Sequence, residues 1–178
     1  NLEEYERLSQ MTSDMLFLAK ADNGLIATRT EIVDLASEVE RLFAFYEALA
    51  EERDVRLVLA GEGRARADRD MLRRAISNLL SNAIRHTPQH GEIRVTIGEG
   101  RAGQTELSVE NPGPPIAPEH LPRLFDRFYR VDASRRKESE GAGLGLAIAK
   151  SIIEAHGGSI SASSAEGTAR FAFTVPAA

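Results

Sequence analysis

The first 23 residues show the longest run of helical periodicity in the chain, and they contain neither Gly nor Pro. The positions that follow a 3-4 spacing are Tyr5, Leu8, Thr12, Met15 and Ala19, and the apolar stripe is widened by Met11, Leu16 and Leu18. This spacing predicts a helix whose apolar side is too rich to face solvent. We expect it to pack in a dimer or helical bundle rather than to fold back on its own domain. Asn23 and Gly24 are expected to end the helix.

After Gly24 the pattern switches repeatedly between helical and strand periods. Helices are expected at about 33–51, 68–86 and 143–156, and strands at about 25–32, 55–61, 64–68, 92–98, 104–110, 159–164 and 169–175. The stretch 111–140 is irregular and rich in proline, and a stretch of that length in a compact domain is more often a lid than a linker. Helices mixed with mostly hairpin-connected strands predict an α+β fold, with helices covering a mixed sheet.

Composition narrows the classes of function. The chain has 178 residues, a net charge of −5 and no cysteine, which argues against a mainly nucleic-acid-binding domain and excludes a disulfide scaffold. No apolar run approaches the roughly 18–20 residues of a membrane span, and no signal peptide is evident. Because the sequence begins at Asn1 rather than Met, we expect it to be a piece of a longer protein.

The helix expected at 68–86 carries two asparagines, Asn78 and Asn82, beside its apolar stripe, followed by Arg85 and His86. Asparagine is a poor residue inside a helix because its amide competes for backbone hydrogen bonds. Taken alone, the pair favours a buried, hydrogen-bonded arrangement. The functional alternative is that both amide oxygens face a magnesium ion and its phosphates, with Arg85 adding positive charge.

A glycine-rich turn, "GAGLGLAIAKS" (141–151), opens the helix expected at 143–156. Free amide N–H groups at a helix N-terminus suit phosphate, although many helices begin after flexible glycines. The spacing lacks the dinucleotide-binding form, and no Gly-Lys-Ser/Thr follows, so a P-loop is excluded. Between the two helices, "PEHLPRLFDRFYRVDASRRKESEG" (118–141) is either a solvated charged loop or a lid whose arginines close over a polyphosphate.

Five motifs carry a family resemblance. In order, they are "NLLSNAIRHTP", "VENPGPPI", "LFDRFYRVD", "GAGLGLAIAKSIIEAHGG" and "GTARFAFTVP". They resemble the catalytic ATP-binding domain of bacterial sensor histidine kinases, which belongs to the GHKL ATPase superfamily. Two stretches, "LPRLFDRFYRVD" and "SDMLFLAKADNG", are most similar to the heavy-metal (copper/silver) sensor kinase subgroup.

The resemblance implies a two-domain organisation. Residues 25–178 would form the two-layer α/β sandwich of the Bergerat (GHKL) fold, with a lid at about 112–141. Residues 1–24 are similar to the second helix of the dimerisation bundle.

The resemblance also implies ATP and Mg²⁺ as cofactors. Asn82 would be the main magnesium ligand, and Asn78 a second ligand or a group that positions the phosphates. The other nucleotide-binding positions that it implies are Arg85, His86, Asn111, Gly113, Ile116, Phe125, Arg127, Phe128, Arg130, Gly141, Gly143, Leu144, Gly145, Leu146 and Thr168.

The stretch "VENPGPPI" (109–116) departs from the family pattern Asp-x-Gly-x-Gly, since Asn111, Gly113 and Pro115 stand at those positions. An amide oxygen still accepts a hydrogen bond from the adenine amino group. Loss of the charge is expected to weaken that bond by about 1 kcal/mol. Pro115 stiffens the loop.

The expected activity is protein-histidine kinase, with transfer of the ATP γ-phosphoryl group to a histidine outside this chain and relay to a response-regulator receiver domain. None of the four histidines, at positions 86, 90, 120 and 156, lies in the family's His-Glu-x-x-Arg-Thr-Pro setting. We therefore expect Mg-ATP binding without self-phosphorylation. The full-length protein is expected to be a homodimer that does not bind nucleic acid. This part would be cytoplasmic, joined to the bacterial inner membrane only through segments absent from the chain.

Two alternatives remain open. One is a GHKL ATPase that acts as a conformational clamp; the amide at Asn78 argues against it, because those proteins usually carry an acid there to activate water. The other is a degenerate dimerisation scaffold that binds no nucleotide, which Asn111 and Pro115 suggest.

Overall fold

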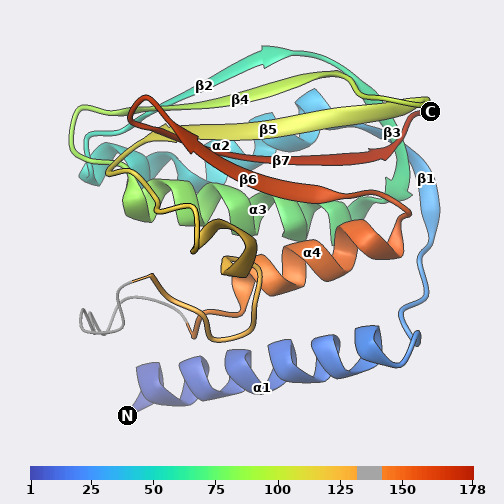
Figure 1. Cartoon of the computed structure of the whole chain (residues 1–178). Coiled ribbons are helices and arrows are strands. Elements are labelled where there is room, and N and C mark those ends of the chain that lie inside the picture. Colours follow the sequence, from blue (N-terminus) through green and yellow to red (C-terminus); the bar gives the residue numbers. More distant parts are fainter. Residues whose placement is uncertain (132–141) are drawn as a thin grey trace.

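The computed structural model describes residues 1–131 and 142–178, which form a sheet layer and a helix layer with one further helix below (Figure 1). The five-stranded sheet has the spatial order β2 (Arg56–Gly61), β4 (Glu92–Glu99), β5 (Gln104–Pro112), β7 (Thr168–Pro176) and β6 (Ile160–Ala165). The β2–β4 pair is parallel and the other pairs are antiparallel. The predicted α+β fold with a mixed sheet is therefore confirmed.

One face of the sheet is covered by α2 (Leu35–Glu52), α3 (Arg69–His86) and α4 (Gly145–Ala155). Alternate residues of the strands point toward these helices, as Ile93, Val95 and Ile97 of β4 do, and all three are buried. The period-2 pattern of the strands and the 3.6-residue period of the helices thus meet in a single core.

A second, two-stranded sheet pairs β1 (Thr30–Asp34) with β3 (Arg64–Asp68). It corrects two predicted boundaries. The strand begins at Thr30 rather than at about residue 25, and α2 begins at Leu35 rather than at 33. Val33 belongs to the strand because it is fully buried opposite Ala65, while the Asp34 side chain accepts the Ser37 N–H and caps α2.

Gly61 is required where the chain leaves β2 for β3. Its φ is +81°, and a Cβ at this position would lie 2.0 Å from the carbonyl oxygen of Ile97. Only glycine allows that backbone conformation together with so close an approach.

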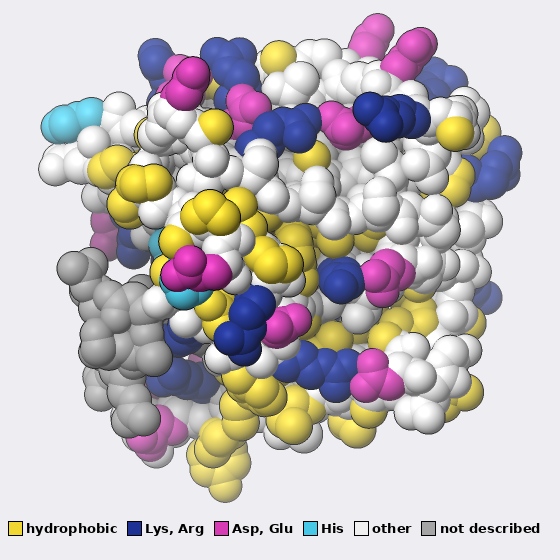
Figure 2. All heavy atoms as spheres, in the orientation of Figure 1, with side chains coloured by type: hydrophobic (Ala, Val, Ile, Leu, Met, Phe, Trp, Pro, Cys, Tyr) yellow, Lys and Arg dark blue, Asp and Glu magenta, His cyan; other side chains and the backbone are white. Residues whose placement is uncertain are grey.

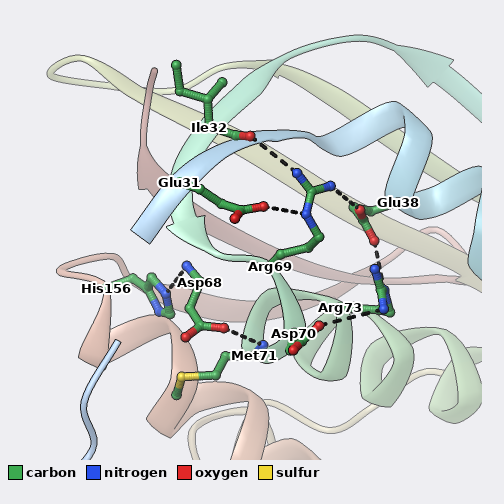
Figure 3. Close-up of polar contacts among 9 residues, drawn as sticks. All are labelled: Glu31, Ile32, Glu38, Asp68, Arg69, Asp70, Met71, Arg73 and His156. Atoms are coloured by element: carbon green, nitrogen blue, oxygen red, sulfur yellow. Dashed lines mark hydrogen bonds and ion pairs between the residues drawn. The ribbon is translucent and has the colours of Figure 1, made fainter. Parts of the chain in front are cut away.

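A buried ion-pair cluster joins α2 to the first turns of α3 (Figure 3). Glu38 is fully buried and accepts hydrogen bonds from Arg69 (2.7 Å) and Arg73 (2.8 Å). Burial alone would raise the pKa of Glu38, but the two arginines outweigh it and hold that pKa below its ordinary value.

The same corner fixes the start of α3. The Asp68 side chain accepts the Met71 N–H, while its backbone N–H donates to Nε2 of the buried His156 (2.9 Å), at the end of α4. Burial raises the pKa of Asp68, but hydrogen bonds from the Arg29 and Met71 N–H groups bring it below its ordinary value.

Helix α1 (Leu2–Asp22) lies along α4, below the helix layer (Figure 1). Its docked side carries Leu18, which is 1% exposed, and Asp14, which pairs with Arg74 at 2.7 Å. The predicted 3-4 stripe is not on that side: Tyr5, Leu8 and Met15 are exposed, and hydrophobic side chains gather along the lower rim of the molecule (Figure 2). The helix therefore folds back on the domain, which the sequence did not favour, through one flank of the widened stripe that includes Leu18 and Met11. Packing of the stripe in a dimer stays a prediction.

The part of the expected lid that the structure describes is mostly irregular and contains one short 3-10 helix, η1 (Leu121–Arg123). None of the helices in the two described ranges has the length and apolar character needed to cross a membrane.

Candidate functional site

The candidate site is built along one row of α3. Asn78, Asn82 and His86 are spaced at i, i+4 and i+8, so they follow one another over about 12 Å of helix. The neighbouring Leu79, Leu80 and Ala83 are buried beneath the sheet. Asn78 and Asn82 are half-buried, and His86 is exposed.

Asn78 forms one end of the site. Its Nδ2 donates to the carbonyl oxygen of Gly145 at 3.0 Å, which ties α3 to the first residue of α4. The amide NH₂ is thereby used in the fold, while Oδ1 keeps its acceptor capacity. The sequence reading of a hydrogen-bonded asparagine is thus confirmed for the NH₂ half of this side chain.

Asn82 is held differently. Within the two described ranges, its side chain has no hydrogen-bond partner, although the residue is half-buried. An amide oxygen in that position is available to a ligand that lies over the helix.

The other end of the site is a corner between α3, β5 and β7. Gly113 donates its N–H to the carbonyl oxygen of Gly167 (3.0 Å), and Pro112 is paired with Thr168. A Cβ on Gly113 would lie 3.6 Å from the backbone oxygen of His86. This is an ordinary contact distance, so the protein alone does not require glycine at position 113.

Asn111 lies in the same corner and is 3% exposed. Its Nδ2 donates to the carbonyl oxygen of Pro112 at 3.0 Å. This bond fixes the orientation of the amide and leaves Oδ1 as the acceptor. Ile116 follows on the rim, where its N–H donates to Oγ of Ser164 (3.0 Å).

The glycine-rich turn before α4 packs against Phe128 of the lid segment. Phe128 and Gly143 both have positive φ, +61° and +78°, and the Phe128 N–H donates to the Gly143 carbonyl oxygen at 3.0 Å. A Cβ on Gly143 would approach the Phe128 Cα to 3.1 Å, so glycine is favoured by both conformation and space. Leu144 is buried behind this contact, and Leu146 is half-buried.

The two phenylalanines of the lid segment differ in their environment. Phe125 packs edge-on against Phe171 of β7, with ring centroids 6.2 Å apart. Phe128 is 53% exposed, so this residue is held by its backbone contact with Gly143 rather than by ring packing.

The arginines are not all directed at the row on α3. Arg127 pairs with Asp22 at the end of α1, at 2.6 Å. Arg85 and Arg130 are half-buried, and both have interaction partners. Gly141 lies outside the described residues.

Sequence reasoning did not anticipate three contacts of this region. They are Asn78 with Gly145, Ile116 with Ser164, and Arg127 with Asp22. Each joins segments at least 48 residues apart, and a single sequence carries no signal for such pairings. Only the polarity of Asn78 inside a helix indicated that it needed a partner.

The chemistry of this arrangement follows from its donor set. Among the described residues, no group of three or more His, Cys, Asp or Glu side chains is placed so that it could hold a metal ion. A metal ion bound along α3 would therefore be held by amide oxygens together with oxygens of its ligand, which suits magnesium.

Comparison with known proteins gives the context of this site. The chain is 53% identical over 178 residues to the sensor histidine kinase CusS of Escherichia coli (strain K12), covering 99% of this chain and 37% of that protein. It is 50% identical over 144 residues to the sensor protein CopS of Pseudomonas syringae pv. tomato, covering 80% of this chain and 29% of that protein. The chain thus spans well under half the length of either relative.

A solved structure agrees with these matches. The chain superposes on full-length ShkA in complex with AMPPNP with a TM-score of 0.86 and 27% sequence identity, covering 99% of this chain and 37% of that one. Residues 67–178, which include both ends of the candidate site, match a single ATPase family profile. By this match the chain belongs to the family of histidine kinase-, DNA gyrase B- and HSP90-like ATPases.

Proposed function

We propose that the chain is the ATP-binding catalytic domain of a two-component sensor histidine kinase, and that it delivers the γ-phosphoryl group of ATP to a histidine outside this chain. The observation that carries the proposal is the row Asn78, Asn82 and His86. It runs from the glycine turn before α4 to the Asn111 corner, in a chain of this ATPase family.

The Asn111 corner is the adenine end of the proposed site. The carbonyl oxygen of Pro112 fixes the Asn111 amide, so that Oδ1 accepts from the adenine amino group. Gly113 leaves the space that a purine needs, since the fold itself does not require glycine there. Thr168 lies beside this corner through its pairing with Pro112.

The phosphate end lies at Gly143 and Gly145. The first turn of α4 offers backbone N–H groups and the positive end of the helix dipole to the phosphates. Asn82 and Asn78 would hold Mg²⁺ through their Oδ1 atoms, and the ion would neutralise charge on the phosphates. Arg85 and Arg130 are the cations that we assign to this end.

The assigned residues bind and orient the nucleotide, and they form no covalent intermediate. Such positioning is sufficient for phosphoryl transfer when the acceptor is supplied separately. The amide at Asn78 supports transfer over hydrolysis, because an amide does not take a proton from water. That observation disfavours the ATPase clamp.

The relatives are much longer than this chain. The proposal therefore also covers the longer protein to which the chain would belong. The exposed stripe of α1 supports a homodimer, because it remains available while the other side of the helix is docked. We assign the receiver domain of a response regulator as the partner that takes the phosphoryl group. We place the domain in the cytoplasm, attached to the inner membrane through other segments, and in the heavy-metal sensor subgroup by its sequence motifs.

Titration with Mg-ADP tests the nucleotide site directly. We expect a thermal shift that saturates at millimolar nucleotide or below, whereas a degenerate scaffold would show none. Adding a separate polypeptide that carries an acceptor histidine should give transfer of label from ATP to that polypeptide. Steady release of phosphate without transfer would instead support the clamp.

A further inference from the structure

The edge strand β2 leaves its backbone open. It pairs only with β4, and no described strand lies on its other side (Figure 1). The Arg56 N–H donates to the Gly91 carbonyl oxygen on the β4 side (2.9 Å). Because a parallel strand directs successive residues to opposite neighbours, the N–H and C=O groups of Leu57 and Leu59 face the open edge.

The two edge strands of the sheet, β6 and β2, differ in composition and in contacts. The opposite edge strand, β6, has the serine-rich sequence "ISASSA", and Ser164 is bonded to the N–H of Ile116 in the segment before η1. In contrast, β2 contains the apolar run Leu57–Ala60, which is half-buried throughout, and like β6 it has neither proline nor lysine. Proteins usually protect an edge strand with proline or lysine, or cover it with another segment. An apolar edge strand without these residues therefore suits pairing with a further strand.

A groove runs alongside this edge, between β2 and α2. It has a volume of about 350 Å³. Its apolar lining includes Phe43, Ala50, Val55 and Leu57, and two acidic residues, Glu47 and Glu51, lie on its α2 side. A side chain of a strand added to β2 would enter this groove at every second position.

The groove keeps a net negative charge. Within the described ranges, Glu47 and Glu51 are exposed and have no ion-pair partner. The nearby arginines are used elsewhere: Arg53 donates to the carbonyl oxygens of Ile84 and Arg85, and Arg56 pairs with Glu92 at 2.7 Å. A partner with lysine or arginine would therefore complement this groove.

We propose that the β2 edge and this groove form a docking site for an extended strand of a partner polypeptide. That strand pairs its backbone with β2, places apolar side chains in the groove and sets Lys or Arg beside Glu47 and Glu51. The site lies at the β2 edge, whereas the nucleotide site lies at β5, β7, α3 and α4, so the proposal stands without the assigned kinase function.

The probe is a capped heptapeptide, Lys-Thr-Val-Thr-Val-Thr-Lys, titrated into the ¹⁵N-labelled chain. Its groove-facing positions would be Lys, Val, Val and Lys. We expect saturating shifts of the Leu57 and Leu59 amides and of α2 amides, with a Kd below roughly 1 mM that weakens as salt is added. The matched peptide with Glu at both ends should bind at least about tenfold more weakly.

Two double variants distinguish an effect of the charges in the groove from an effect of the net charge of the chain. Glu47→Lys with Glu51→Lys should weaken binding of the lysine peptide at least about tenfold. Glu40→Lys with Glu52→Lys makes the same charge change on exposed positions of α2 outside the groove, and should change the Kd less than about twofold. All four positions are exposed, so both variants should keep the wild-type fold, with spectral changes confined to α2 and its neighbours.

Several results would overturn the proposal. Shifts that avoid β2 and α2, or no shift at millimolar peptide, would show that the edge takes no strand. Equal weakening by the two double variants, or equal binding of both peptides, would show that the groove does not select its partner.

Discussion

At the scale of single residues, the site depends on how each amide is held. Asn111 and Asn78 both donate their NH₂ groups to backbone carbonyls, so their oxygens face the ligand side. Asn82 has no such constraint within the described ranges. The three asparagines should therefore respond differently to substitution, although all three are assigned to nucleotide binding.

Substitution of Asn111 tests the adenine end. Asn111→Leu should abolish ATP binding because no acceptor remains for the adenine amino group. Asn111→Asp should keep or tighten binding through a charged acceptor. It should also lower the free energy of unfolding by about 1 kcal/mol, because the bond to the Pro112 carbonyl is lost. Mg-ADP titration and denaturant melts measure both effects, and normal ATP binding by the Leu variant would show that this assignment is wrong.

The pair Asn82→Ala and Asn78→Ala separates ligand binding from folding. Asn82→Ala should change stability by less than about 0.5 kcal/mol and should remove the gain in ADP affinity that magnesium gives over EDTA. Asn78→Ala should lower stability by about 1 kcal/mol, because the Gly145 carbonyl loses its bond to Nδ2. An Asn82→Ala variant that retains the full magnesium effect would contradict the assignment of this ligand.

The residue types of the site could be read from the sequence, because asparagine within a helix and the Asn-Pro-Gly loop are locally unusual. Their partners could not. The Gly145 carbonyl that orients Asn78 lies 67 positions away, and Arg127, which is expected at phosphate, pairs in this structure with Asp22 of α1. Such choices depend on how the elements pack rather than on local pattern.

At the scale of elements, α2 and α3 are joined by the Glu38 cluster rather than by apolar contact alone. The sequence pattern predicted the ends of both helices to within about two residues. It could not show that α2 starts later than expected, since Val33 suits a helix stripe and a strand equally. Pairing of Val33 with Ala65 decided between them.

The Glu38 cluster predicts a specific pH dependence. Because the folded-state pKa of Glu38 lies below its ordinary value near 4.5, its contribution to stability is full above that value and is lost as pH falls through the folded-state pKa. Glu38→Gln should therefore cost about 3 kcal/mol at pH 7, because Arg69 and Arg73 lose the buried carboxylate that they share, although Arg69 keeps Glu31 and Arg73 keeps Asp70. That cost should shrink below pH 4.5.

Urea denaturation of both proteins between pH 3 and 7 measures this difference. Glu40→Gln, an exposed position on the same helix, is the control and should change stability by less than about 0.5 kcal/mol at every pH. A Glu38→Gln cost that stays constant with pH would mean that the ionised carboxylate does not stabilise the fold.

At the scale of the whole molecule, α1 combines two surfaces. One side docks on the domain through Leu18 and Asp14, and the other presents the apolar stripe of Tyr5, Leu8 and Met15. The sequence showed the stripe but not the docking, because the docked side is mixed in character.

Self-phosphorylation is predicted to be absent from this chain. His156 is buried and bonded to Asp68, His120 is bonded to Tyr129, and His90 pairs with Asp54. None of the histidines lies on α1. Incubation with γ-labelled ATP should therefore leave the chain unlabelled while Mg-ADP still binds. Rapid, acid-labile labelling of the chain would overturn this expectation.

The contact between Phe128 and Gly143 has a consequence for how this domain tolerates change. The Phe128 N–H donates to the Gly143 carbonyl oxygen, and a Cβ at position 143 would approach the Phe128 Cα to 3.1 Å. Gly143 also has a φ of +78°, which favours glycine. A side chain introduced at position 143 would therefore displace Phe128 as well, so a change before α4 would reach a residue 15 positions earlier in the chain.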